Sequence, residues 1–330
     1  MNIKKIAVIA SIAGFAGIAL ASQALLVTRV WDPQWNPYRP SFQRILEGAK
    51  NKDAGIESAR MDIDLDVRAK QEGADVFRIM IGLEGVATQS SEIDGKFQGT
   101  MNVGVSGEGI TFEGAGEIIV TDEENLYVKI TKFPALSFLE MYLGMNAEMF
   151  KNQWIRIPIE EVGASTGMML EQEKKFLKKA EELFYDQAKS YLVKELPDEK
   201  IRGEKTYHYQ ITFTGSDIAD IVQEANKESG IEGNKSEEMV EEMRNMGEMS
   251  VDLWLSNRNF YPYRISFEKE LNAKIFDETA SETDSVSVKA GVEIWDYNVP
   301  VESIDAPENA KTVEEIFGAF QYLYGTEEYR

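Results

Sequence analysis

Hydrophobic and polar residues alternate with a period of two along much of the chain. The clearest segment is 60–70, where apolar side chains alternate with charged ones. Its apolar members are Met61, Ile63, Leu65 and Val67. Successive side chains of a strand point to opposite faces, so the pattern predicts a long strand with one apolar and one polar face. The same alternation recurs at residues 77–83, 207–213, 251–255 and 286–294. Such strands are typical of antiparallel sheets with one face on a core and the other in water.

Turn-forming residues separate these segments. They are Asp94-Gly95, Gly107-Glu108-Gly109 and Asn257-Arg258-Asn259. Segment 99–116 is rich in glycine but still alternates. Because glycine in a strand often accompanies a bulge or a sharp bend, we expect strongly curved strands there.

Helical patterns lie between the strands. An apolar stripe predicts a long helix over residues 168–194, and shorter helices are expected over 216–226 and 236–246. Thr312 and Glu315 have the spacing of a capping box that begins a last helix. No linker rich in Pro, Gly or Ser divides the chain after residue 40. We therefore predict an α+β fold in which residues 41–330 form one domain.

Residues 134–150 form a different kind of helical segment. Met141, Met145 and Met149 recur at every fourth position, and Leu136 is one of the residues that leave hardly any polar face. A helix that is apolar on nearly all sides is either buried in the core or faces something apolar that is not protein. Methionine suits the second case because its unbranched side chain repacks around irregular partners.

The N-terminus predicts export from the cytoplasm. Lys4 and Lys5 precede 23 uncharged residues, 6–28. This stretch is long enough to span a membrane, and the lysines favour a cytoplasmic N-terminus. Residues 1–30 are therefore interpreted as a membrane anchor or a signal peptide that is cleaved before secretion. Prolines and tryptophans in residues 31–40 indicate a stiff spacer. An anchored chain would be a single-pass protein of the cell membrane, with its domain outside the cytoplasm.

Composition excludes several classes of protein. The 330 residues carry 35 Lys and Arg against 57 Asp and Glu, a formal charge of −22, with one histidine and no cysteine. The absence of cysteine excludes disulfides, thiolate catalysis and attachment through a lipid-modified cysteine. The strong negative charge argues against binding of nucleic acid, which requires clustered Lys and Arg. We expect no cofactor and no metal site.

Two motifs suggest chemistry and are interpreted as structural. Gly163-Ala164-Ser165-Thr166-Gly167 matches the elbow of serine hydrolases, but the preceding strand alternates, whereas that elbow belongs to a parallel sheet. A hydrolase that uses Ser165, with His208 as base, is thus a minor alternative. Asp62, Asp64 and Asp66 have the spacing of a calcium loop, but the required glycine and the final acid are missing. They are better explained as the solvated face of a strand.

The order of several phrases resembles a known superfamily. Residues 125–130 and 153–157 form two strands around the methionine-rich segment, and Gly203-Glu204-Lys205-Thr206-Tyr207 opens the second half. A Trp-containing strand at 251–255 and the phrase Pro262-Tyr263-Arg264-Ile265 follow. Over roughly residues 41–310 this order resembles the LolA-like superfamily, and within it the LppX/LprG-type lipoproteins of bacterial cell envelopes.

The resemblance implies a fold and a function. The fold would be a strongly curved antiparallel sheet, an unclosed half-barrel, with helices covering its concave face. Members of the family hold acyl chains between the sheet and the helices. Carried onto this chain, the cavity and its lid would be formed by Met61, Ile63, Leu65, Tyr127, Leu136, Met141, Met145, Met149, Trp154, Tyr209, Trp254 and Phe267. The lipobox cysteine of LppX-type proteins is absent, so attachment to the cell membrane would depend on residues 6–28.

The sequence thus favours a non-enzymatic, extracytoplasmic protein that binds a lipid or another apolar ligand. The alternative is a structural or interaction module of the cell envelope, with a filled core and an acidic surface. The sequence names no protein partner.

Overall fold

The computed structural model describes most of the chain after residue 55. The described residues are 40–42, 56–89, 95–107, 109–121, 125–132, 151–158, 169–187, 191–230, 234–275, 280–312 and 315–316. The expected anchor at residues 6–28, the methionine-rich segment 134–150 and the Ser165 motif lie outside them. Within the described part of the chain, no helix has the length and apolar character needed to cross a membrane.

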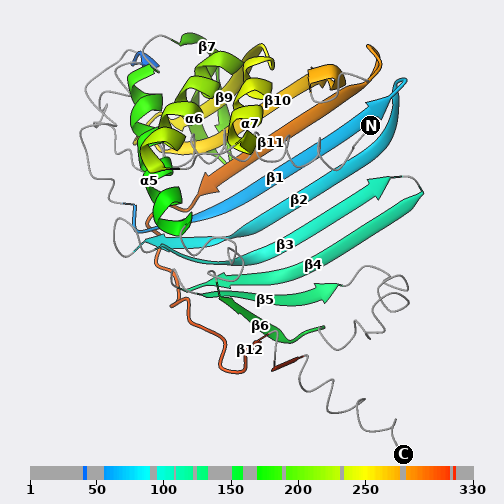
Figure 1. Ribbon diagram of the computed structural model, residues 1–330. Coiled ribbons are helices and arrows are strands. Elements are labelled where there is room, and N and C mark those ends of the chain that lie inside the picture. The colour runs from blue at the N-terminus through cyan, green and yellow to red at the C-terminus, as the bar shows by residue number, and fades with distance from the viewer. Residues whose placement is uncertain are drawn as a thin grey trace, which may run out of the picture.

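All of the described strands belong to one sheet of twelve strands (Figure 1). The strands are β1 (Ser58–Gln71), β2 (Ala74–Gln89), β3 (Gly95–Gly107), β4 (Ile110–Val120), β5 (Asn125–Lys132), β6 (Trp154–Pro158), β7 (Leu192–Ile201), β8 (Glu204–Thr214), β9 (Glu248–Ser256), β10 (Pro262–Asn272), β11 (Ser285–Trp295) and β12 (Lys311–Thr312). Their order across the sheet is β12-β6-β5-β4-β3-β2-β1-β11-β10-β9-β8-β7. The first and last strands in this order do not pair, so the sheet is a curved, open half-barrel, as the family resemblance implies.

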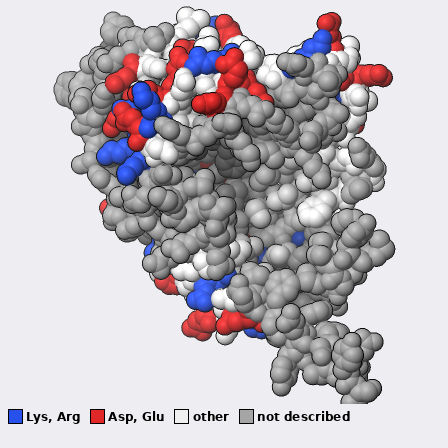
Figure 2. All heavy atoms as spheres, viewed as in Figure 1, with Lys and Arg blue, Asp and Glu red and all other residues white. Residues whose placement is uncertain are grey.

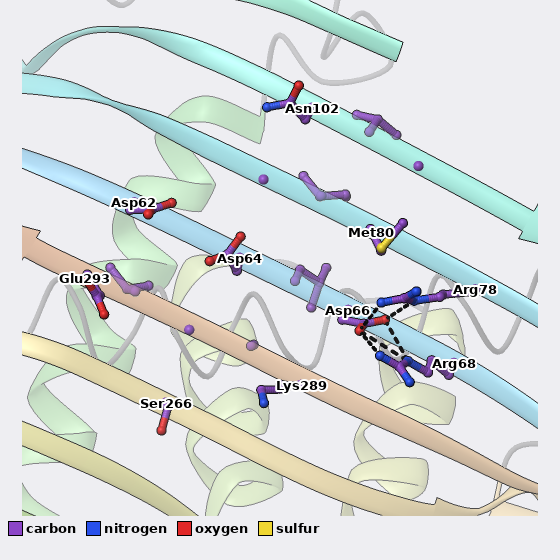
Figure 3. A pocket seen from close by; sticks show the side chains of 18 of the residues that line it. Asp62, Asp64, Asp66, Arg68, Arg78, Met80, Asn102, Ser266, Lys289 and Glu293 are labelled. Atoms are coloured by element: carbon purple, nitrogen blue, oxygen red, sulfur yellow. Dashed lines mark hydrogen bonds and ion pairs between the residues drawn. The ribbon is translucent and has the colours of Figure 1, made fainter. Parts of the chain in front are cut away.

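Strand β1 lies at the centre and pairs antiparallel with β2 and β11. Its register places Leu65 opposite Ile81 on one side and Ala290 on the other, so the apolar members of three strands share one face. We call this the inner face, because the helices pack on it. The charged residues Asp62, Asp64 and Asp66 point to the opposite, outer face (Figure 3). The predicted alternation of β1 is therefore confirmed.

Three helices lie over the part of the inner face formed by β7–β11 (Figure 1). They are α5 (Met169–Gln187), α6 (Gly215–Ser229) and α7 (Asn234–Arg244); a short 3-10 helix, η3 (Ala273–Ile275), follows β10. Helix α6 begins with a capping box, in which Thr214 and Asp217 exchange hydrogen bonds, and ends at Gly230 in the left-handed conformation. The capping box predicted at Thr312 and Glu315 is also formed, at 2.8 and 3.1 Å.

One predicted boundary is wrong. The helix expected to reach residue 194 ends at Gln187, and Leu192 begins strand β7. Tyr191 and Leu192 were placed on the helical stripe, but Tyr191 instead packs its ring 5.8 Å from the ring of Phe213 on β8. Pairing of β7 with β8 overrides the helical spacing, because it satisfies the main-chain groups of both strands.

Candidate functional site

The inner face is closed over β8–β11 by the helices. Side chains there, such as Tyr209, Leu253 and Val286, are at most 1% exposed. Val222 of α6 and Met243 of α7 belong to the same buried cluster. This half of the inner face is a filled core with no space for a ligand among these residues.

The other half of the inner face, over β2–β5, is also apolar but only partly buried. We call its side chains the inner strip. Its members are Leu83, Met101, Val103, Val105, Ile118, Val120, Val128 and Ile130. None of them belongs to a buried cluster of the described residues.

Glycines shape the inner strip. Gly114 lies opposite Val103, and Gly116 lies opposite Met101. Neither residue adds a side chain to this part of the face, because glycine has no Cβ. Nearby, the ring of Phe97 lies over Gly85 and Gly99, where an added Cβ would approach the ring to 2.6 and 2.7 Å. The strip is therefore a smooth apolar surface that β-strand pairing alone does not bury.

The structure brings five of the predicted cavity residues together on the inner face. They are Met61, Ile63, Leu65, Tyr209 and Phe267. Leu65 and Tyr209 are buried in the core of the helix-covered half, and Ile63 and Phe267 pack against that core. Tyr209 also donates a hydrogen bond of 2.9 Å to the carbonyl of Pro40. The lid residues Leu136, Met141, Met145 and Met149 lie outside the described residues.

The placement of Tyr127 and Trp154 in the same cavity is wrong. Tyr127 pairs with Ile119 and Arg156, on the outer face. It forms a small separate cluster there with Ile119 and Ile304, against which Trp154 packs. Ile304 belongs to the segment that leads from β11 to β12, and this segment crosses the outer face. Apolar residues are thus buried on both faces of this half of the sheet, so aromatic character alone does not identify the inner face.

Trp254 likewise lies on the outer face. Its neighbours across the strands are His208 of β8 and Arg264 of β10. The His208 ring stacks on Trp254 at 4.1 Å, and its Nε2 lies 2.8 Å from Asp252. The same histidine lies 3.3 Å from Glu199 through Nδ1. With both ring nitrogens against carboxylates, His208 is a structural part of the outer face and is not arranged as the base of a serine hydrolase.

A groove of about 920 Å³ crosses the outer face from β10 to β4 (Figure 3). Its floor is a single cross-strand row of mostly small residues. From β10 to β4 the row reads Ser266, Gly291, Asp64, Gly82, Asn102 and Ala115. The rows on either side carry larger side chains, so the groove results from the small size of the residues in the middle row.

Most charges on the walls of the groove are neutralised by each other. Asp66 accepts hydrogen bonds from Arg78 at 2.8 Å and from Arg68, which lower the pKa of its carboxyl well below the ordinary value against the effect of burial. Glu293 is held by Arg264 and, at 2.8 Å, by Arg202. Burial raises the pKa of Glu293, but hydrogen bonds and charge from these two arginines outweigh burial and lower it.

Asp62 and Asp64 differ from these paired acids. Burial and the charges of Asp64 and Glu84 raise the pKa of Asp62, and only the Arg202 guanidinium, 3.6 Å away, opposes them. Asp64 lies on the floor between two glycines and has no ion pair or hydrogen bond with any described residue. The sequence motif Asp62-x-Asp64-x-Asp66 was correctly interpreted as a polar strand face. The groove was missed, because its small residues come from six strands.

Comparison with solved structures finds proteins with a weak structural similarity to this chain. LprF from Mycobacterium bovis is 14% identical with a TM-score of 0.38, over 77% of this chain and 90% of LprF. The lipoprotein LppX from Mycobacterium tuberculosis is 11% identical with a TM-score of 0.31, over 76% of this chain and 91% of LppX. MucB is 8% identical with a TM-score of 0.26, over 77% of this chain and 59% of MucB.

No protein-family model and no curated protein matches the chain. An LppX lipoprotein, of the type that the sequence motifs resemble, is thus among the solved structures found. A fold by itself does not identify a ligand.

Proposed function

We propose that this chain is a non-enzymatic binding protein that holds an apolar ligand, most simply lipid acyl chains, against the inner strip. The observation that carries the proposal is the contrast within the inner face. The helix-covered half is filled, whereas the strip of β2–β5 is equally apolar and remains partly exposed. An apolar surface of this kind is stabilised by a partner that removes it from water.

The binding mechanism would be burial without any reaction. Each CH₂ group of an acyl chain gains about 0.8 kcal/mol when it leaves water. Val103, Met101 and Ile130 would contact the chain directly, and the neighbouring glycines would leave room for it. Met61 and Ile63, at the border with the filled half, would limit how far the chain reaches. The resemblance to LppX-type proteins agrees with this use of the fold and does not establish it.

The proposal includes a location. Residues 6–28 would hold the protein in the cell membrane with the sheet outside the cytoplasm, or would be removed on secretion. Membrane fractionation of cells that express the full chain distinguishes the two. An anchored chain stays with the membrane after a carbonate wash, and a cleaved chain is released and has lost the mass of the leader.

Ligand binding is tested by native mass spectrometry of the full chain purified in mild detergent, followed by solvent extraction of bound lipid. We expect one lipid adduct per chain. The Val103→Glu variant places a carboxylate in the inner strip and should lower the occupancy at least about tenfold, because an unpaired charge against acyl chains is costly. The matched control is Gln98→Glu, which adds the same charge to β3 on the outer face. It should bind as the wild type does.

A wild-type chain without any adduct, or equal loss in both variants, would contradict the proposal. Either result would favour the alternative function, an interaction module of the cell envelope.

A further inference from the structure

The outer-face groove is separate from the inner strip, because the full thickness of the sheet lies between them. Its walls are formed by cross-strand rows of long side chains, and its floor by a row of small ones. Six strands contribute to the floor, so the groove is about 24 Å long at the usual spacing of neighbouring strands. An extended polypeptide of about seven residues has the same length.

The charges of the groove select the sign of its ligand. Asp66, Glu293 and Glu113 are each neutralised by Arg or Lys side chains; the Glu113 pair with Lys132 is 2.6 Å long. Asp64 is exposed on the floor and has no partner among the described residues, and the carboxyls of Asp62 and Glu84 lie beside it in the sheet. A positively charged group at Asp64 would supply the missing counter-charge.

The form of the cation is also restricted. Within the part of the chain that the structure describes, no group of three acidic or histidine side chains is arranged to hold a metal ion. Asp64 is flanked in its row by Gly82 and Gly291, which leave room for a long side chain to enter from above. An ammonium or guanidinium group at the end of a flexible stem fits this approach, since the stem can lie over the glycines.

A second observation points to a ligand that also carries hydrogen-bond acceptors. Trp254 lines the groove and is 7% exposed, and its indole N–H is buried without a hydrogen-bond partner among the described residues. A buried donor without an acceptor is costly, and such groups are usually paired. The carbonyl groups of a polypeptide are acceptors of the required kind, and one of them would reach the N–H after the Trp254 side chain turns toward the groove, because the N–H is buried in this structure.

We propose that the outer-face groove binds an extended basic peptide segment of another protein, with one Lys or Arg side chain at Asp64. The overall charge of −22 favours association with a cationic partner over long range. The row that forms the floor of the groove consists of small and polar residues, and both apolar and charged side chains line the groove around it. An extended peptide presents apolar, polar and charged groups together, which fits such a mixed lining.

The test uses the full chain and a fluorescein-labelled peptide, Thr-Lys-Thr-Lys-Thr-Lys-Thr, with binding measured by fluorescence anisotropy. The Asp64→Asn variant should weaken binding about tenfold, the usual effect of losing a hydrogen-bonded charge. Gly291→Phe should also weaken binding by filling the floor, and space is available for the new side chain because a Cβ at Gly291 meets only one atom at 4.0 Å. Trp254→Phe keeps an aromatic ring beside His208 but removes the N–H, and should weaken binding severalfold.

The matched control is Glu308→Gln. Glu308 is an exposed acid of the segment between β11 and β12, outside the groove, and its variant changes the net charge by the same amount as Asp64→Asn. It should bind the peptide as the wild type does. Equal weakening by Glu308→Gln and Asp64→Asn would overturn the proposal, because the attraction would then come from the overall charge. Wild-type binding by Asp64→Asn would overturn it as well.

The same assay separates a peptide from a membrane surface. Vesicles of phosphatidylethanolamine and phosphatidylcholine present amine headgroups to the full chain. One outcome is that the vesicles compete with the labelled peptide for the wild type and not for Asp64→Asn. In that case the groove binds a lipid headgroup, and the peptide assignment is wrong. Loss of peptide binding leaves lipid occupancy of the inner strip unchanged, so the two proposals fail independently.

Discussion

The two halves of the inner face are built from similar residues and differ in what packs on them. Over β8–β11 the helices bury Leu253 to 1% exposure, and Ile294 and Val286 to the same extent or further. The described helices α5, α6 and α7 lie over that part of the inner face (Figure 1), whereas Leu83 and Val103, on β2 and β3, are only partly buried.

In the view of Figure 2, charged side chains gather over the helices, as expected for the solvated outer side of a covered core. The comparison shows that an apolar strand face specifies which side must be covered but not how completely it is covered. The first half forms the filled core of the described residues, and the second is the surface that we propose binds the ligand.

Truncation of one leucine in each half gives the largest expected difference. Leu253→Ala leaves a cavity in a filled core and should lower the free energy of unfolding by about 2 to 5 kcal/mol. Leu83→Ala removes the same atoms from the inner strip and should cost less than about 1 kcal/mol, because part of that side chain is already in water. Urea unfolding of both variants, followed by circular dichroism, measures the difference. Equal losses would mean that the strip is a second filled core.

Packing of the helices on each other is the next largest effect. Gly215 begins α6 so close to α7 that an added Cβ would overlap the main-chain carbonyl of Met243. Gly215→Ala should therefore lower the free energy of unfolding by about 1 to 3 kcal/mol, the usual cost of overpacking. Gly82→Ala is the matched control, since its Cβ would meet only the Asp64 carboxylate, at 3.6 Å. A thermal melt in which both variants behave alike would show that α6 and α7 can move apart at no cost.

Two aspartates of β1 extend the comparison to the outer face. Asp66 is held by Arg68 and Arg78, which lower its pKa, so its charge stabilises the folded state above the ordinary pKa of 3.8. That stabilisation is lost as the pH falls below 3.8. Asp66→Asn should cost about 1 kcal/mol at pH 7, after allowance for solvent screening, and progressively less below pH 3.8.

Asp62→Asn should change the free energy of unfolding in the opposite direction. Burial and two neighbouring carboxylates raise the pKa of Asp62, so its ionised form weakens the fold above the ordinary value, and the neutral variant should be as stable as the wild type or more so. Urea unfolding between pH 7 and pH 2.5 measures both variants. Equal loss for Asp62→Asn and Asp66→Asn at pH 7 would contradict the pairing described for this face.

Much of the fold could be predicted from local pattern. The strands predicted from alternation are confirmed as β1, β2, β8, β9 and β11, and the helices expected over 216–226 and 236–246 are α6 and α7. Strand β7 was not predicted, because Tyr191 and Leu192 continue the apolar spacing of the preceding helix. The strand forms because its main chain pairs with β8. Strand β7 also lies at the edge of the sheet, where a strand needs fewer apolar side chains, and its Leu192 is 71% exposed.

Only part of the candidate site could be predicted from the sequence. Met61, Ile63, Leu65, Tyr209 and Phe267 share the inner face because they follow the apolar side of alternating strands. Tyr127, Trp154 and Trp254 were assigned to the same face from the resemblance, but their strand register places them on the outer face. Tyr127 is buried there against Ile304, and the partly buried Trp154 packs on the same cluster. Ile304 lies at least 150 residues later in the chain than either of them. No local pattern records a cover that comes from so far away.

The sequence by itself determined the strands, the caps and the two faces of β1, because these depend on the direction of neighbouring side chains and on main-chain geometry. Only the tertiary structure decided how those faces are used. It places β1 beside β11, more than 200 residues later in the chain, and so sets Gly291, Asp64 and Gly82 in one row. It also places the described helices α5, α6 and α7 over one half of the sheet. The row of small residues and the position of the helices both depend on which distant segments pack together. The packing of the whole chain determines those contacts.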